Sequence, residues 1–533
     1  MGGGFSGWLT ARALEVNYPD LAITVVDSDK HQRLGVGEKF GYNAPYELRR
    51  LMGLTDDRML MWETGAIYNY GTRWKNFWQD NHDVAYGKFY NLNVKSLTKF
   101  YSGFDYVNYV EHWNKKEDDY GLLEAWFKIN QNNNKTYYDY INECNEAEWF
   151  LKNPLAPYDK NNDYVLRNQE GWGYNIDAEG GVSFLKSLCL QNKNLKYVSC
   201  AVAQINYTDQ DINSIILENN EEITADLFID CTGFARVLLE KNSTWIDMGK
   251  NFNDSAWVCP TAYIDPASEM NGAANFTGKD WGWTFKLPLY HRIGNGYVFN
   301  SNLSDPDQIL KEFETIVNET KLAPPRLLQW KPGYYKKVWV GNVLALGVSA
   351  WWIDPFDSPA FEIQTRGLND LIKIWGNNPR DCSEQYNVNN DYVVQERNLR
   401  LIASFGLSKR SGYYWDIQRH NYTTNYGNNA FVNFLTGKLD SINQHYRNFI
   451  QQIYYRIAAV TDFDRTKIDL PNINKDDSQM ATAYFNYMKQ RNLYVQKQTW
   501  PNYYSWIKEN RFDKMDSRSF RNLRHPQWQD RSY

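Results

Sequence analysis

Apolar residues near the start of the chain follow first a helical and then a strand-like pattern. Residues 8–16 carry apolar side chains at helical spacing and predict a short amphipathic helix after a glycine-rich loop. Residues 21–27 form a short apolar run of the kind found in a buried parallel strand. The first part of the chain therefore predicts a loop, a helix and a strand, in that order.

Later segments predict a larger set of elements. Residues 172–190 predict a helix, and residues 196–217 predict two strands joined by a turn. Residues 227–229 predict a buried strand that ends at a carboxylate and a glycine turn. Residues 80–165 are rich in asparagine and aromatic residues and predict an insertion or cap rather than a sheet layer. From residue 370 onward the sequence predicts helices and no strong strands.

The loop at the start of the chain matches a dinucleotide-binding pattern. Gly2, Gly4 and Gly7 form GxGxxG, and Asp27 lies 20 positions after the last of them. Glycines let the backbone approach a pyrophosphate, the helix N-terminus offers free N–H groups, and the acid can accept from a ribose hydroxyl. We therefore expect a mixed α/β fold, with a Rossmann-like core, an additional sheet and a helical C-terminal region.

One part of this pattern is missing. A buried strand normally leads into the glycine loop, but Met1 stands where that strand should end. We expect either that the natural start lies some residues upstream or that this chain is truncated.

Composition and charge exclude several classes of protein. The formal net charge of −5 gives no electrostatic reason to expect nucleic acid, and no apolar run approaches the length of a membrane span. The six cysteines form no CxxC pair and the histidines show no metal-binding spacing, so we expect no metal. With no secretory signal at the start, these features predict a reduced, cytoplasmic protein. Aromatic residues make up 16% of the chain, enough to wall a roomy aromatic pocket.

Taken in order, several motifs resemble those of the flavin-dependent halogenases of the tryptophan-halogenase type. They are GGGFSGW at 2–8, VVDS at 25–28, GVGE at 35–38, DCTGF at 230–234, WTFKLP at 283–288 and the segment 347–361. The resemblance implies an FAD-binding core over residues 1–369, with the insertion at about 80–165, and a substrate-side helical region over residues 370–533. It covers roughly residues 1–370 and fades in the tail.

The resemblance also implies an activity and a set of partners. Such enzymes receive reduced FAD (FADH2) from a separate NAD(P)H-dependent flavin reductase and use oxygen and a halide ion. Hypohalous acid then passes through a tunnel to an electron-rich aromatic small molecule. The chain has no second GxGxxG for a nicotinamide cofactor, which agrees with a partner reductase.

The matching positions imply the following candidate site residues. For the cofactor they are Gly2, Gly4, Phe5, Ser6, Gly7, Asp27, Ser28, Gly37, Glu38, Val202, Asp230, Gly233, Gly347 and Pro355. For the tunnel or substrate they are Trp283, Phe285, Leu287 and Pro288. Two alternatives stay open: Asp230 caps a turn, and the alternating rings at 283–287 form an aromatic core face.

The candidate catalytic positions depart from the family. Asn69 stands where the family has its lysine, and an amide cannot carry an ammonium charge. Asp357, followed by Ser358, stands where the family has a glutamate, so its carboxylate is displaced by about 1 Å, enough to cost about a hundredfold. Pro359 has no N–H for a halide, which leaves Ala360 as the donor.

These departures leave several interpretations open. Lys39 and Lys75 are the nearby substitutes for the missing lysine, and both are also readily explained as solvated side chains. The weakened cradle favours either a larger, softer halide or none, so the rival functions are a flavin monooxygenase or oxidase and a non-catalytic flavin-binding protein. Candidate walls of the substrate pocket in the helical region are Tyr454, Tyr455, Trp500 and Trp506.

Overall fold

The computed structural model describes most of the chain. It covers residues 1–28, 37–40, 49–54, 57–87, 122–130, 147–166, 172–317, 320–375, 379–424 and 473–513, with a few single positions between 132 and 143. Gly35, most of the predicted insertion, Tyr454 and Tyr455 lie outside the described residues.

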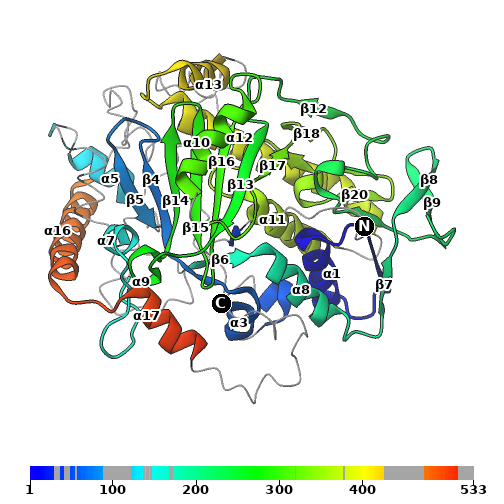
Figure 1. The fold of residues 1–533 in the computed structure, drawn as a ribbon, viewed down its shortest axis with the longest axis horizontal. Helices are drawn as coiled ribbons and strands as arrows, with labels where there is room; N and C mark the ends of the chain where they lie inside the picture. The colour runs from blue at the N-terminus through cyan, green and yellow to red at the C-terminus, as the bar shows by residue number, and fades with distance from the viewer. Residues whose placement is uncertain are drawn as a thin grey trace.

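The N-terminal loop joins two small sheets, each of which contains one parallel pair of strands. Strand β1 (Ile23–Asp27) pairs with β7 (Leu195–Ser199), and β11 (Phe228–Asp230) pairs with β20 (Val343–Ala345), which also pairs antiparallel with β19 (Trp339–Val340). The Gly2 amide donates to the Val26 carbonyl, and the Cys231 amide donates to the Met1 carbonyl. The backbone of Met1 and Gly2 thus links β1 to β11, and Figure 1 shows the N-terminus beside α1 and β20.

Helix α1 (Phe5–Asn17) follows the glycine loop, as predicted, and packs against α8 (Ala178–Cys189). The predicted helix over 172–190 is wrong in its first part, because Gly173–Asp177 is strand β6. All five residues of β6 are buried between β2 (Gly37–Phe40) and β3 (Ile67–Asn69), so sheet pairing decides their conformation. The Asp177 side chain accepts from the amides of Glu179 and Gly180, which starts α8.

A seven-stranded sheet forms the middle of the molecule (Figure 1). Its order is β17 (Arg326–Gln329), β13 (Ser255–Thr261), β16 (Ile293–Phe299), β15 (Gly282–Pro288), β14 (Ala273–Lys279), β4 (Gly71–Lys75) and β5 (Asp83–Gly87). Strand β5 corrects the expectation that 80–165 contributes no sheet layer, because it pairs with β4 at the edge. Two smaller sheets contain β8 (Val202–Thr208), β9 (Asp211–Leu217) and β10 (Glu222–Ile223), and β12 (Trp245–Asp247), β18 (Gly333–Tyr335) and β21 (Trp351–Trp352).

Helices surround these sheets, and the described residues after 370 form helices without strands, as predicted. In Figure 1, α16 (Lys475–Lys497) and α17 (Tyr503–Ile507) run along one side of the molecule, and α16 packs against α5 (Leu122–Ile129) near the β4–β5 edge. The other α-helices of the described residues are α3 (Arg58–Thr64), α7 (Ala147–Lys152), α9 (Pro266–Glu269), α10 (Pro306–Val317), α11 (Pro359–Ile374), α12 (Ser383–Gly406) and α13 (Tyr413–Thr424). Among the described residues, no helix is long and apolar enough to cross a membrane.

Candidate active site

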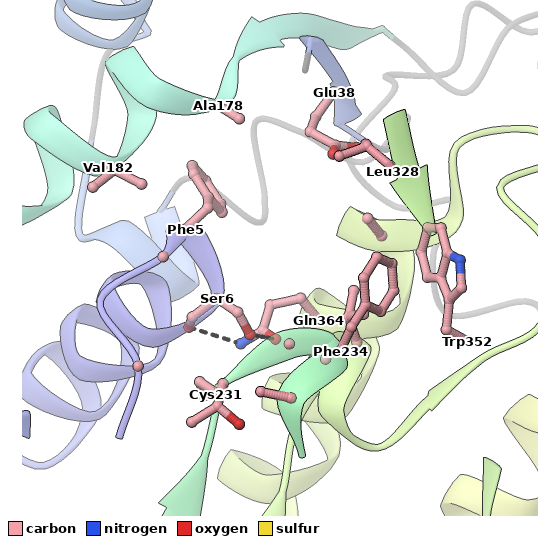
Figure 2. A pocket seen from close by; sticks show the side chains of 18 of the residues that line it. Phe5, Ser6, Glu38, Ala178, Val182, Cys231, Phe234, Leu328, Trp352 and Gln364 are labelled. Atoms are coloured by element: carbon pink, nitrogen blue, oxygen red, sulfur yellow. Dashed lines mark hydrogen bonds between the residues drawn. The ribbon is translucent and has the colours of Figure 1, made fainter. Parts of the chain in front are cut away.

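A cavity of about 610 Å³ lies where the glycine loop, β2, the seven-stranded sheet and the start of α11 meet. Figure 2 shows Phe5 and Ser6 of α1, Glu38 of β2, Gln364 of α11 and the ring of Trp352 around the space. Of the residues expected to bind cofactor, twelve line it: Gly2, Gly4, Phe5, Ser6, Asp27, Ser28, Gly37, Glu38, Val202, Gly233, Gly347 and Pro355. Residues far apart in the chain therefore meet around one space.

The three glycines of the GxGxxG loop are each required for a different structural reason. Gly2 has a φ of 101°, which disfavours any side chain. A Cβ on Gly7 would lie 1.8 Å from the Gly2 carbonyl oxygen, so the closeness of helix and loop excludes one. A Cβ on Gly4 would have no heavy atom within 4 Å, because Gly4 faces the cavity at the start of α1. Gly7 thus supports the loop from behind, and Gly4 leaves room for a ligand.

Two carboxylates that the sequence predicts beside the glycine loop, Asp27 and Asp230, differ in their surroundings. Asp27 ends β1, lines the cavity and accepts a hydrogen bond from the Gly3 amide at 2.9 Å. Asp230 is fully buried, accepts from the Thr232 and Leu238 amides at 2.9 and 2.7 Å, and does not line the cavity. The structure therefore places Asp230 as a turn cap and leaves Asp27 as the carboxylate at the glycine loop.

Helices α1 and α11 are joined at the base of the cavity. The Ser6 hydroxyl donates to the Gln364 side-chain oxygen (Figure 2). The Gln364 amide donates to the Thr10 hydroxyl at 2.8 Å. A Cβ on Gly347 would lie 2.3 Å from that Gln364 oxygen, so glycine is needed there for the approach. This contact fixes the start of α1 against α11.

Glu38 brings a second carboxyl group into the cavity wall. Part of its side chain is exposed to the cavity, yet burial raises its pKa to about 8. The carboxyl is therefore mostly protonated at neutral pH, so it adds little negative charge to a space that an anion could enter.

The opposite wall is apolar and largely aromatic. Phe285 and Leu287 of β15 line the cavity, while Trp283 and Pro288 do not. The Trp283 ring is fully buried and packs edge-on against Phe276. Sequence reasoning missed the rings of Phe234, Trp330 and Trp352, which also line the wall. They come from loops and short strands without a helical or strand period, so no local pattern marked them.

The turn before α11 is strained. Asp357 and Ser358 have φ angles of 55° and 51°, a left-handed conformation that costs about 1–3 kcal/mol for a residue other than glycine. Pro359 is the first residue of α11, and Ser358, Pro359 and Ala360 line the cavity. The buried Arg397 donates to the carbonyls of Asp354, at 3.2 Å, and Phe356, which holds the turn in place. The N-terminus of α11 therefore faces the cavity with one N–H replaced by proline.

Asn69 lies in a buried network of amides away from the cavity. It is fully buried, its side chain donates to the Asn175 oxygen at 2.7 Å, and its own oxygen accepts from the Gly71 amide at 3.0 Å. Asn175 in turn donates to the Pro288 carbonyl at 3.1 Å. The residue at the lysine position thus joins strands β3, β6 and β15.

Lys39 and Lys75, the two substitutes considered from the sequence, have different environments. Lys75 is exposed at the end of β4. Lys39 is 5% exposed, and its ammonium lies 3.0 Å from the Asp357 carboxylate. The structure therefore brings Lys39, and not Lys75, to the carboxylate at the catalytic position.

Trp506, a candidate wall residue, belongs to a packed aromatic cluster beside β3. Its ring stacks on Tyr158 at 3.8 Å between centroids, and the Arg511 guanidinium donates to the Tyr68 hydroxyl at 2.5 Å. Trp500 packs edge-on to Phe150 at 5.1 Å. Neither tryptophan lines the cavity described above.

The residues around the cavity fit a dinucleotide such as FAD. An open glycine and free helix N–H groups suit a pyrophosphate, Asp27 suits a ribose, and the apolar wall suits a flat ring system. Among the described residues, no group of three or more His, Cys, Asp or Glu side chains is arranged to hold a metal ion.

Comparison with known proteins consistently finds tryptophan halogenases. The sequence profile of the tryptophan halogenase family matches residues 1–463. Tryptophan 7-halogenase RebH of Lentzea aerocolonigenes is 24% identical over 379 residues, which cover 70% of this chain and 68% of that protein. 7-Chloro-L-tryptophan 6-halogenase KtzR of Kutzneria sp. is 23% identical over 449 residues, which cover 78% of this chain and 80% of the relative.

Solved structures share the fold. BrvH, a flavin-dependent halogenase from Brevundimonas sp. BAL3, superposes with a TM-score of 0.75 at 19% identity, covering 95% of this chain and 98% of the other. This likeness shows the mixed α/β fold with a Rossmann-like part that the sequence predicted.

Proposed function

The chain belongs to the tryptophan halogenase family, and from that premise we propose that it halogenates an electron-rich aromatic small molecule, using FAD, oxygen and a halide ion. Bound reduced FAD would give two electrons to oxygen, and the halide ion would give two more, so that halide is oxidised to hypohalous acid and the oxygen is reduced. A separate NAD(P)H-dependent flavin reductase would deliver the reduced cofactor. The substrate class follows from the relatives, whose names specify tryptophan.

One observation carries this proposal: a single cavity extends from the glycine loop to the N-terminus of α11. The first end suits the phosphates of a dinucleotide, and the second offers partial positive charge to a small anion. A flavin ring between them would lie against Phe285, Leu287 and Trp352. This arrangement would place halide next to the reactive part of the cofactor.

The described residues then take separate roles. Gly4 and the free amides of α1 would hold the pyrophosphate, and Asp27 would accept from the ribose. The Ala360 amide would donate a hydrogen bond to the halide. Glu38, being protonated, would not repel the anion. We assign the cofactor core to residues 1–369 and the substrate-side region to residues 370–533.

A flavin monooxygenase without halide chemistry is the second candidate. Pro359 is the observation that favours it, because the start of α11 has lost one of its anion donors. Flavin and oxygen chemistry would remain possible, since neither requires that N–H group.

The experiment measures flavin first and products second. The purified chain should retain FAD and consume oxygen when a flavin reductase supplies FADH2. Phenol and indole should then give products whose mass shows added chlorine, bromine or iodine when the matching halide is present. Hydroxylated product with no halogenated product would favour the monooxygenase, and bound flavin without added oxygen consumption or product would favour a non-catalytic flavin-binding protein.

A further inference from the structure

Lys39 lies on a strand that borders the cavity, with its side chain on the other face of that strand. Glu38 lines the cavity, and successive residues of a strand point to opposite faces, so Lys39 points away from it. In the turn before α11, Ser358 lines the cavity and the neighbouring Asp357 does not. The ion pair is thus one residue removed from the cavity on both segments.

Strand register places Lys39 and Asn69 on the same face of one sheet. Lys39 and Ile67 both pair with Asn175, and Asn69 follows Ile67 by two residues. Directly paired residues share a face, as do residues two apart in a strand. Since β6 separates β2 from β3 and Asn69 lies two residues along β3 from the position opposite Lys39, the two positions are about 12 Å apart.

A buried lysine is retained only with a compensating partner. The Lys39 ammonium is 5% exposed and lies 3.0 Å from Asp357, which is 27% exposed. Asp357 is held in a left-handed conformation, and the backbone beside it is fixed by Arg397. A strained residue that presents a carboxylate to a buried ammonium indicates a functional arrangement rather than a surface ion pair.

We propose that Lys39 is a catalytic residue that takes the place of the absent lysine at Asn69, and that it acts with Asp357 on hypohalous acid and the aromatic ring. This inference rests on the proposed function. The lysine would then come from β2, at one edge of the three-stranded sheet, and not from β3 at the other edge, and it approaches the carboxylate from the side of β2.

The proton transfers of such a pair balance. A ring carbon attacks the halogen of hypohalous acid, so a carbon–halogen bond forms and the halogen–oxygen bond breaks with its electron pair on oxygen. The Lys39 ammonium gives that oxygen a proton, which makes water. The ring carbon loses its proton to Asp357, and the proton passes from Asp357 to Lys39 across their contact, which restores both groups.

The first test compares Lys39→Met, Lys39→Arg and the exposed control Lys75→Met in the FAD-loaded enzyme. The two Lys39 variants should lose at least about a hundredfold in halogenated phenol or indole. The amount of hypohalous acid that a β-diketone captures in solution should be the same for these variants as for the native protein. Arginine keeps the charge and the ion pair but gives up a proton poorly, so it separates proton donation from structural support. Lys75→Met should match the native rate.

The outcomes distinguish this inference from the function on which it rests. Native-like product formation by Lys39→Met or Lys39→Arg would overturn the role of Lys39 alone. Native protein that gives neither halogenated product nor captured hypohalous acid would overturn the proposed function, and the inference with it.

A second measurement reads the ion pair without catalysis. Acetic anhydride acylates unprotonated amines, and mass spectrometry reports the rate at each lysine. Lys39 should react more slowly than Lys75, and Asp357→Asn should raise the Lys39 rate about tenfold, since the charged form loses its partner. If Lys39 were acylated at the same rate in the native protein and in Asp357→Asn, both with FAD retained, the proposed ion pair would be wrong.

Discussion

The glycine loop at one end of the cavity and the ion pair just outside its other end are built in different ways. At the glycine loop, the backbone of residues 2–7 makes the site, and the residues that matter are close together in sequence. Beyond the α11 end, side chains make it: Lys39 meets Asp357 across 318 positions of the chain. A site made by the backbone tolerates few substitutions, because steric contacts fix its shape. In a site made by side chains, the same charged group can be supplied from a different strand.

The largest expected effect is at the backbone end, with Gly7→Ala. The new Cβ would lie 1.8 Å from the Gly2 carbonyl oxygen, so the loop and α1 must separate. We expect a loss of at least about 3 kcal/mol in the free energy of unfolding, together with loss of FAD retention. Denaturant unfolding and the absorbance of bound flavin measure the two.

Gly4→Ala is the matched variant. Its Cβ meets no atom within 4 Å, so folding should change little while FAD affinity falls, because the methyl group enters the cavity. If Gly4→Ala unfolded as readily as Gly7→Ala, the separation of supporting and ligand-facing glycines would be wrong.

At the side-chain end, Asn69→Lys should lower the free energy of unfolding by about 3 kcal/mol. A lysine can still donate to Asn175, but it has no acceptor for the Gly71 amide, and it buries a second ammonium on the face that holds Lys39. Asn213→Lys, at an exposed position of β9, is the control and should stay within about 0.5 kcal/mol of the native protein. A native-like melting temperature for Asn69→Lys would show that the face can hold both lysines.

Local patterns in the sequence predicted the backbone end well. The helix at 8–16, the strand at 21–27 and the three glycines are local features, and the structure has α1, β1 and the loop in those places. Strand β6 was mistaken for helix because pairing with β2 and β3, which lie far away in the chain, decides its conformation.

The chemistry beyond the α11 end could be predicted only in part. The departures at Asn69, Asp357 and Pro359 are visible in the sequence, but the choice between Lys39 and Lys75 depends on strand register. Alternation along β2 places Lys39 opposite to Glu38, and only the fold of the 355–358 turn brings Asp357 to it. Asp230 shows the converse, since a strand-end carboxylate can satisfy the backbone of its own turn.

Glu38 lies between the two ends and should give the cavity a pH dependence. Its pKa of about 8 is raised by burial from 4.5, so the folded protein holds this proton over a range where the unfolded chain has lost it. Stability of the cofactor-free protein should therefore fall as pH rises from about 4.5 to 8. Ionisation above pH 8 would also repel halide, and a tenfold rise in halide KM corresponds to about 1.4 kcal/mol.

Glu38→Gln should remove both trends, while Glu222→Gln, at an exposed position of β10, should keep them. Unfolding free energy and halide KM between pH 6 and 9 are the measurements. Identical pH profiles for Glu38→Gln and the native protein would show that another group controls the cavity.

The smallest expected effect is at Pro359, where the start of α11 can regain a backbone donor. Pro359→Thr adds one N–H that faces the cavity, and one such hydrogen bond contributes about 1 kcal/mol, or about a fivefold lower KM for chloride. Chloride should gain more than iodide, because the smaller anion depends more on hydrogen bonds. Pro306→Thr changes the first residue of α10 in the same way, away from the cavity, and controls for the effect on a helix start. An equal change of KM for all halides, or the same change in Pro306→Thr, would mean that α11 does not hold the anion.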